Sequence, residues 1–144
     1  MPKSVKLQVI TPSKLFYEGD IELVIVKTLT GEEGYMAGHS WACKLLDVGE
    51  MLIQEAGSKD FKTAAVSGGF VDIMKDIVIY TDAAEWSADI DVERANSMRA
   101  YGEDWLTEHS DTDEDPELIE RTHVNIAMQK VRVKVAEGGR RKKK

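Results

Sequence analysis

The stretch Ile90-Asp91-Val92-Glu93-Arg94-Ala95 has the residue types and spacing best suited to binding a ligand. Asp91 and Arg94 stand three residues apart and would share one face of a helix, with Ile90 as an apolar lid beside them. The carboxylate could hold an adenine by hydrogen bonds, and the guanidinium could hold a phosphate. The same residues also suit a helix cap with a surface ion pair, which on the residues alone is the favoured interpretation.

The other candidates for chemistry are weaker. Ser67-Gly68-Gly69 lacks the Lys-Ser/Thr pair and the following helix of a phosphate loop, so a tight β turn or bulge is predicted. The acidic stretch 111–115 lacks the central Gly and the final Glu of a calcium loop and is interpreted as a solvated link. No metal-ligand spacing, and no set of nucleophile, base and orienting group, is found among His39, His109, His123 and Cys43. The sequence therefore predicts a protein without a catalytic or metal site.

Cys43, which lies close to Trp41 in the sequence, is predicted to be a core residue. A single cysteine excludes an internal disulfide and suits a reducing compartment. No apolar run approaches the length of a membrane span, and no signal peptide is recognised at the start.

The candidate ligand stretch lies at a joint, residues 80–95, where the pattern of the chain changes. Asp82 and Glu85 have the spacing of a capping box, and Asp91 with Glu93 forms a second helix-start signal. Two start signals this close predict a short turn and then a long helix. We expect two domains, a β-sandwich over residues 1–86 and a two-helix hairpin with a basic tail over residues 87–144.

The net charge of −7 conceals a strong asymmetry. Residues 1–90 hold 8 Lys and Arg against 14 Asp and Glu, residues 91–120 hold 2 against 11, and residues 121–144 hold 9 against 1. An acidic segment followed by a basic one suits a charged partner, or the two segments neutralise each other as antiparallel neighbours. The basic tail has no interleaved aromatic residues, so nucleic acid is not the expected partner.

The first ninety residues read as short strands separated by turns, the pattern of an all-β sandwich or flattened barrel. Turns are expected at residues 18–20, 38–39, 47–50, 56–60, 67–69 and 74–76, with a loop at 31–34 and strands between them.

The last fifty residues read as two helices. Ala95, Met98, Tyr101 and Trp105 form a predicted apolar stripe on the first, from residue 91 to about 108. Asp115 and Pro116 are predicted to start the second helix, and Gly138-Gly139 to end it. Its segment 131–135 alternates like a strand, but is assigned to the helix. A hairpin with one apolar stripe is unstable in water alone, so it must dock on the sandwich or on another chain.

Over residues 5–95 the chain resembles the epsilon subunit of bacterial and chloroplast F-type ATP synthase. The segments that carry the resemblance, in order, are Leu7-Gln8-Val9-Ile10-Thr11-Pro12, Gly31-Glu32-Glu33-Gly34-Tyr35-Met36-Ala37-Gly38-His39, Val66-Ser67-Gly68-Gly69-Phe70-Val71 and Thr81-Asp82-Ala83-Ala84-Glu85 through Ile90 to Ala95.

The resemblance implies a β-sandwich of about ten strands followed by an α-helical hairpin. It implies a non-catalytic rotor subunit of the central stalk that binds the gamma subunit and the c-ring, and so couples ion translocation to ATP synthesis. It further implies that the hairpin, when extended, reaches the alpha and beta subunits and inhibits ATP hydrolysis. The expected location is peripheral, on the cytoplasmic face of the bacterial membrane within the complex.

The resemblance also implies site residues. The c-ring loop corresponds to Gly31, Glu32, Glu33, Gly34, Tyr35, Met36 and His39, and an ATP site corresponds to Glu85, Ile90, Asp91, Arg94, Ala95 and Arg132. The family often has Pro where Ala37 and Trp41 stand, and Arg where Tyr101 and Met128 stand. No cofactor is required, and ATP is expected to bind weakly if it binds.

Lys130, Arg132, Lys134 and the terminal run 140–144 are hypothesised to hold the extended hairpin against acidic surfaces of the beta subunits. The alternative to a rotor subunit is a free-standing ATP-sensing module, which would bind nucleotide tightly without partners. An enzyme is a distant third, for want of an acid–base or nucleophilic set.

Overall fold

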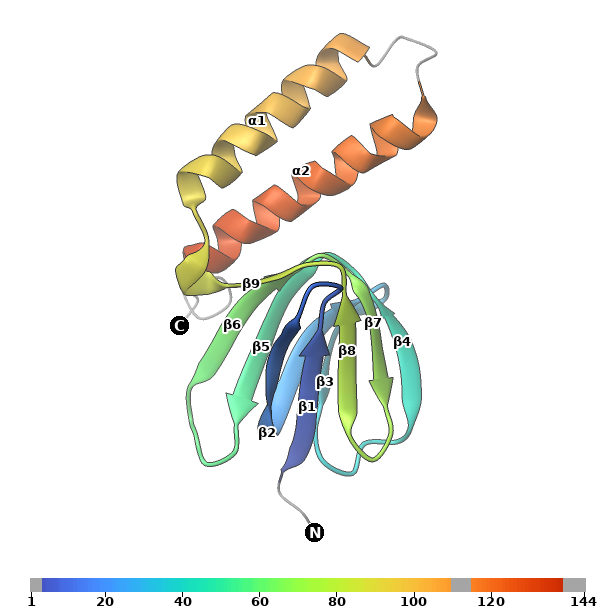
Figure 1. Ribbon diagram of the computed structural model, residues 1–144, viewed down its shortest axis with the longest axis vertical. Coiled ribbons are helices and arrows are strands. Elements are labelled where there is room, and N and C mark those ends of the chain that lie inside the picture. Colours follow the sequence, from blue (N-terminus) through green and yellow to red (C-terminus); the bar gives the residue numbers. More distant parts are fainter. Residues whose placement is uncertain (1–3, 110–114, 139–144) are drawn as a thin grey trace. The chain divides into compact units, whose positions relative to one another are not determined.

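The computed structural model describes residues 4–109 and 115–138, which divide into two compact units, Met1–Trp86 and Ser87–Lys144 (Figure 1). The first unit holds nine strands, β1 (Val5–Ile10), β2 (Leu15–Thr28), β3 (Gly31–Tyr35), β4 (Ala42–Leu46), β5 (Gly49–Glu55), β6 (Phe61–Val66), β7 (Gly69–Ile73), β8 (Ile77–Thr81) and β9 (Ala84–Trp86). The second holds the 3₁₀ turn η1 (Ser87–Asp89) and the helices α1 (Val92–His109) and α2 (Pro116–Ala136).

The strands form a β-sandwich whose two layers share the long strand β2. The strand order is β1-β8-β7-β4-β2-β5-β6-β9, β3 pairs with β2, and a further pairing of β1 with β2 closes one layer on itself. β1 and β8 run parallel, whereas the other pairs are antiparallel. The predicted sandwich followed by a helical hairpin is confirmed, with nine strands among the described residues.

Alternating residues of each strand fill the space between the layers. Leu7 and Val9 of β1, Val24 and Val26 of β2, and Ile79 of β8 are at most 1% exposed. Because side chains alternate across a strand, every second residue contributes to this core and the residues between them face outward.

One predicted turn, at residues 18–20, is wrong. β2 runs through this segment without interruption and pairs with β1 on one side and with β5 on the other. Gly19 is needed here for close packing, since a Cβ on it would lie 2.8 Å from the hydroxyl oxygen of Tyr17. That hydroxyl donates a 2.8 Å hydrogen bond to Glu55 on β5. The glycine therefore marks a crowded strand and not a chain reversal.

The predicted turn at residues 67–69 is confirmed. Gly68 and Gly69 have φ angles of +104° and +128°, which favour glycine. A Cβ on Gly69 would collide with the backbone oxygen of Tyr80 on the neighbouring strand β8. The pair of glycines thus brings β7 against β8.

Two polar or short strands were not recognised from the sequence, and one helix start is wrong. β4 was not predicted, and residues 31–34, predicted as a loop, belong to β3. Residues 84–86, which include Glu85 of the predicted capping box, form β9 along β6. Trp86 holds β9 in place by stacking on Phe16 at 4.4 Å between ring centroids and meeting Tyr17 edge-on at 5.9 Å. Tertiary packing here overrides the local capping signal.

The helix starts at Asp91 and Asp115 are confirmed. The Arg94 amide donates to Asp91 Oδ1 at 3.0 Å, and the Glu117 amide donates to Asp115 Oδ1 at 3.1 Å. α2 continues through residues 131–135 despite their three valines, and Gly138, at φ +102°, follows its end. Gly139 and the terminal basic run lie outside the described residues, as do residues 111–114 of the acidic link.

The two helices approach each other closely at Gly102. This residue is buried, and a Cβ on it would lie 2.9 Å from Cγ1 of Ile126 on α2. Tyr101, predicted to belong to the apolar stripe of the first helix, is 74% exposed, so that part of the predicted stripe is wrong. The contact face contains Gly102 because the absent side chain lets the helices come together.

Candidate functional site

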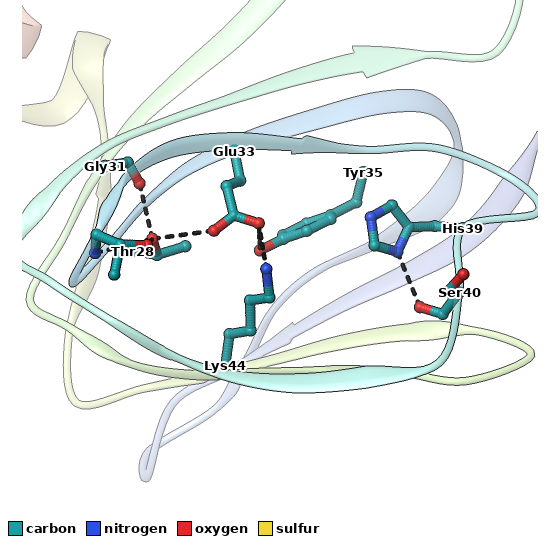
Figure 2. Close-up of polar contacts among 8 residues, drawn as sticks. Thr28, Gly31, Glu33, Tyr35, His39, Ser40 and Lys44 are labelled. Carbon is teal, nitrogen blue, oxygen red and sulfur yellow. Dashed lines mark hydrogen bonds and ion pairs between the residues drawn. The ribbon is translucent and has the colours of Figure 1, made fainter.

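The predicted c-ring loop contains a polar network around Glu33, which lies on the core side of β3 opposite the buried Val26 (Figure 2). Glu33 Oε1 accepts hydrogen bonds from Lys44 Nζ at 2.5 Å and from the Tyr35 hydroxyl at 3.4 Å. Its other oxygen accepts one from Thr28 Oγ1 at 3.2 Å. Three side chains, one each from β2, β3 and β4, thus donate to one carboxylate.

This network joins two strands that share no ladder of their own. β3 pairs with β2, whereas β4 pairs with β7 along its length and with β2 only where Thr28 faces Leu46. Lys44 lies opposite the buried Val71 and so starts from the core side of β4, although its side chain is 41% exposed. The ion pair between Lys44 and Glu33 therefore closes the open side between β3 and β4.

The electrostatics follow from these contacts. The hydrogen bond from Lys44 is the main cause that lowers the pKa of the Glu33 carboxyl below its usual value. Burial, followed by the neighbouring Glu33 charge, raises the pKa of Tyr35 to about 12. Glu33 is therefore held as an anion and Tyr35 as a neutral donor at neutral pH, which keeps the network intact.

Beyond β3 the chain turns back and exposes apolar side chains. The ring of Tyr35 meets the ring of His39 edge-on at 5.0 Å (Figure 2). The His39 amide donates to the Met36 carbonyl at 3.2 Å. Met36 is 55% exposed and Trp41 is 73% exposed. The polar network around Glu33 thus lies where the chain enters a loop, and the apolar side chains of Met36 and Trp41 beyond it are exposed to solvent.

The prediction that Cys43 lies in the core is wrong, because Cys43 is exposed, as is the neighbouring Trp41. Cys43 lies on β4 between Ala42 and Lys44, and it is those neighbours that point toward the interior. Strand alternation therefore places the thiol on the outer face.

The predicted nucleotide residues occupy different settings. Ile90 and Ala95 are buried, whereas Asp91 and Arg94 are exposed at the start of α1, where one Asp91 oxygen already caps the helix. Glu85 lies on β9 in the first unit. The geometry therefore shows the cap that was the favoured interpretation.

Arg132 on α2 donates to Gln129 Oε1 at 2.6 Å, and Gln129, only 4% exposed, donates to Asn125 Oδ1 at 3.0 Å. This chain of polar contacts fixes the guanidinium along its own helix. Lys130 and Lys134, the other predicted partner-binding cations, are exposed.

A depression of about 240 Å³ lies between the helices and is lined by Asn96, Arg99, Lys130 and Val133. It holds one cation from each helix, and Arg99 is also paired with Glu103 at 2.8 Å. Sequence reasoning did not select Arg99. Its spacing from Asn96 put both on one helix face, but only the crossing with α2 brings that face to Lys130.

Among residues 4–109 and 115–138, no group of His, Cys, Asp and Glu could hold a metal ion. Neither described helix is long and apolar enough to cross a membrane.

The chain is similar to known proteins over most of its length. The family model described as "ATP synthase, Delta/Epsilon chain, beta-sandwich domain" matches residues 4–87. The ATP synthase epsilon chain of Ruminococcus albus is 42% identical over 103 residues, which are 70% of this chain and 75% of the relative. That of Alkaliphilus metalliredigens is 36% identical over 107 residues, 74% of this chain and 78% of the relative.

Solved structures share the fold at lower identity. A chain of the mitochondrial ATP synthase of Euglena gracilis superposes with a TM-score of 0.75 at 18% identity, over 90% of this chain and 79% of that one. A chain from the central stalk and c-ring structure of the Tetrahymena thermophila mitochondrial ATP synthase superposes with a TM-score of 0.58 at 15% identity. The match covers 94% of this chain and 97% of that one.

Proposed function

This chain belongs to the family of ATP synthase delta and epsilon chains, and we propose that, as the non-catalytic epsilon subunit of that complex, it binds the gamma subunit and the c-ring. In this role it turns with the central stalk and couples ion translocation to ATP synthesis. Its place is then peripheral, on the cytoplasmic face of the membrane. The shared fold with a chain from the Tetrahymena central stalk and c-ring supports the assignment to the rotor.

The observation that carries the c-ring contact is the polar base under the loop after β3. Glu33 holds Lys44, Tyr35 and Thr28 together, so the loop that follows β3, residues 36–39, leaves the sandwich from a fixed platform. A loop held at its base loses less conformational entropy on binding than a free one. The exposed Met36 at its tip supplies the apolar contact.

The test is a Met36→Glu chain assembled into the complete ATP synthase, with Val124→Glu on α2, 49% exposed, as the matched control. We expect Met36→Glu to weaken co-purification with the c-ring and to reduce ATP-driven ion pumping, while the control retains both. Full pumping by the Met36→Glu enzyme would exclude this loop as the c-ring contact.

The hairpin is proposed to regulate the enzyme by inhibiting ATP hydrolysis when it extends toward the alpha and beta subunits. Its separation from the sandwich as a compact unit supports this role. Lys130 and Lys134 are exposed and are available to acidic surfaces of the beta subunits, together with Arg132.

Hydrolysis should be compared between enzymes carrying the full chain and a chain ending at Val135. We expect faster hydrolysis with the shortened chain. A Lys130→Gln, Lys134→Gln chain should show a part of the same increase, because it keeps the helix and loses two charges. Equal rates in all three enzymes would contradict electrostatic holding of the hairpin.

ATP is proposed as a weak regulatory ligand at Ile90, Asp91, Arg94 and Ala95, with Glu85 and Arg132 as the further residues that the family resemblance implies. Arg94 and the cations of the hairpin depression support an anion site, whereas the capping role of Asp91 and the hydrogen bond from Arg132 to Gln129 oppose it. Titration with ATP, followed by the amide shifts of Asp91 and Arg94, decides the matter. The absence of a saturable shift at millimolar ATP would rule the site out, and with it the alternative of a free-standing ATP sensor.

A further inference from the structure

The depression between the two helices brings together cations that are far apart in the sequence. It has a volume of about 240 Å³ and is lined by Asn96, Arg99, Lys130 and Val133. Arg99 belongs to α1 and Lys130 to α2, so the two positive charges line one depression only while the helices lie side by side. Two like charges in one depression raise each other's electrostatic energy, and a bound anion lowers it.

The cations of this depression lie on the flank of the hairpin opposite to the proposed ATP residues. Successive residues of an α-helix are turned by about 100°, so Arg94 lies about 140° from Arg99 around α1. By the same count Arg132 lies about 160° from Lys130 around α2. The buried Gly102, which meets α2, lies at an angle between Arg94 and Arg99. The hairpin therefore has cations on both flanks, and those of the depression form a separate group.

The side chains that line the depression have hydrogen-bond donors to spare. Within the part of the chain that the structure describes, the Asn96 side chain makes no hydrogen bond and Lys130 forms no ion pair. Arg99 Nη1 donates to Glu103 Oε1 at 2.8 Å, which uses one of the five N–H donors of the guanidinium. An ammonium, a guanidinium and an amide together match the oxygens of a phosphate group.

The size of the depression favours a small anion. Its volume equals that of about eight water molecules in the liquid, and it lies below the roughly 300–1,000 Å³ of sites for drug-sized ligands. A nucleotide, with its base and ribose, would extend out of it. Phosphate or diphosphate fits inside, and Val133 completes the lining without a side-chain acceptor that would repel an anion.

We propose that this depression binds a phosphate or diphosphate ion between Arg99 and Lys130, with Asn96 as a further donor. The ion contacts both helices at once, so it stabilises the hairpin only while α1 and α2 are side by side. At ten times its dissociation constant, the ion should reduce the opening of the hairpin about eleven-fold. The binding is independent of the proposed function, whereas its effect on ATP hydrolysis rests on that function.

The first test titrates the full chain with sodium phosphate and, separately, with sodium diphosphate. It follows the NMR shifts of the backbone and side-chain N–H groups of Asn96, Arg99 and Lys130. Sodium chloride at the same ionic strength is the control for general screening. We expect saturable shifts with a dissociation constant of about 1 mM or below, and no saturable shift with chloride. The ion that binds more tightly is identified as the ligand.

Three variants locate the ion. Arg99→Gln with Lys130→Gln in one chain should bind it at least about ten-fold more weakly, because each helix loses a cation. Arg94→Gln with Arg121→Gln is the matched control, since it removes one cation from each helix outside the depression and should bind like the wild type. Glu103→Gln should bind about three-fold more tightly, because Glu103 competes with the ion for Arg99. Such a gain cannot result from misfolding.

The second test measures hydrogen exchange of the backbone amides with and without the ion at ten times its dissociation constant. We expect exchange in α1 and α2 to slow about ten-fold, with the strand amides unchanged. The variant that lacks Arg99 and Lys130 should show no such slowing.

Equal shifts with chloride, or binding by the Arg99, Lys130 variant within about two-fold of the wild type, would overturn the proposal. An unchanged affinity of Glu103→Gln would also overturn it, as would slower helix exchange in the Arg99, Lys130 variant. ATP is the last arm of the titration. If ATP displaces the ion and shifts Arg94 together with Arg99, the depression is part of the ATP site and the separate site is excluded. A negative ATP titration contradicts only the proposed regulatory ligand and leaves the ion site in place.

Discussion

The sandwich and the hairpin differ in how much apolar side chain they bury. The sandwich packs large side chains such as Leu7, Ile53 and Ile79 at zero exposure between two layers. Within the described part of the hairpin, the buried helix residues are Ala95, Gly102, Ile126, Gln129 and Val135. Buried apolar area is the main stabilising term, so the sandwich is a stable body and the hairpin a marginal one. The proposed docking thus falls on the stable unit and the proposed switching on the marginal one.

The largest test of this comparison is Ile79→Ala in the core. The substitution removes three carbons at a site with no exposure and should lower the free energy of unfolding of the sandwich by about 2–5 kcal/mol. Denaturant unfolding, followed by tryptophan fluorescence, measures it. A loss below about 1 kcal/mol would show that the core is less tightly packed than the burial indicates.

A smaller effect, confined to the hairpin, is expected from Gly102→Val. The new side chain meets Ile126 at a Cβ distance of 2.9 Å, and such overpacking costs about 1–3 kcal/mol. Tyr101→Val is the matched control, since it introduces the same residue at an exposed neighbouring position. Hydrogen exchange should accelerate in α1 and α2 for Gly102→Val, with strand amides unchanged. Similar exchange in the two variants would indicate a propensity effect without a clash.

Asp91→Ala should affect the start of α1 by about 1 kcal/mol, because it removes the oxygen that accepts from the Arg94 amide. Asp91→Asn keeps a capping oxygen and should retain most of the stability. Fraying of the first turn, read from amide exchange of residues 92–95, measures both. If ATP protection is lost in the Asn variant while the helix start is preserved, Asp91 has a ligand role beyond the cap.

The smallest effect expected is a pH dependence at the base of the loop. The pKa of Glu33 is lower in the fold than its usual value of 4.5, chiefly through Lys44. The unfolded chain therefore binds this proton more readily, so the stabilisation is present above about pH 4.5 and is lost as the pH falls through the folded pKa. As the pH falls from 4.5 through the folded pKa of Glu33, the difference in unfolding free energy between wild type and Glu33→Gln should become smaller.

Lys44→Met and the Glu33, Lys44 double variant complete a double-mutant cycle for this pair. A coupling energy that stays constant from neutral pH to about pH 3 would contradict the ion pair as its source. On the alkaline side, the raised pKa of Tyr35 implies stability that declines as the pH rises from 10 toward 12, and Tyr35→Phe should remove that decline.

The alternation of apolar residues predicted β1, β7 and β8, because buried and more exposed residues alternate along each of these strands. It failed for β3, where Glu32 and Glu33 read as a loop, since the partners that satisfy Glu33 are Lys44 and Thr28 from other strands. It failed again for β9, where Trp86 packs on β2. These strands depend on contacts that are distant in sequence.

In the hairpin, the local signals at Asp91 and Asp115 were sufficient, because a cap is formed by neighbours in sequence. Local signals did not show that Gly102, and not Tyr101, faces α2. Hydrophobicity favours tyrosine at a buried position, and only the close approach of α2 requires glycine. For the same reason the Asp91–Arg94 spacing was recognised and Arg99 was not.

The parallel pairing of β1 with β8 has a consequence for biosynthesis. Leu7 to Ile10 find their partners at Ile77 to Tyr80, about half the chain away, so this layer cannot close until β8 has left the ribosome. The hairpin, made last, joins residues that are near one another in sequence and can form as it emerges. The β-sandwich is therefore the slow part of the chain to fold, although it is synthesised first. Nascent chains stalled before and after residue 81 is exposed should differ sharply in their resistance to protease.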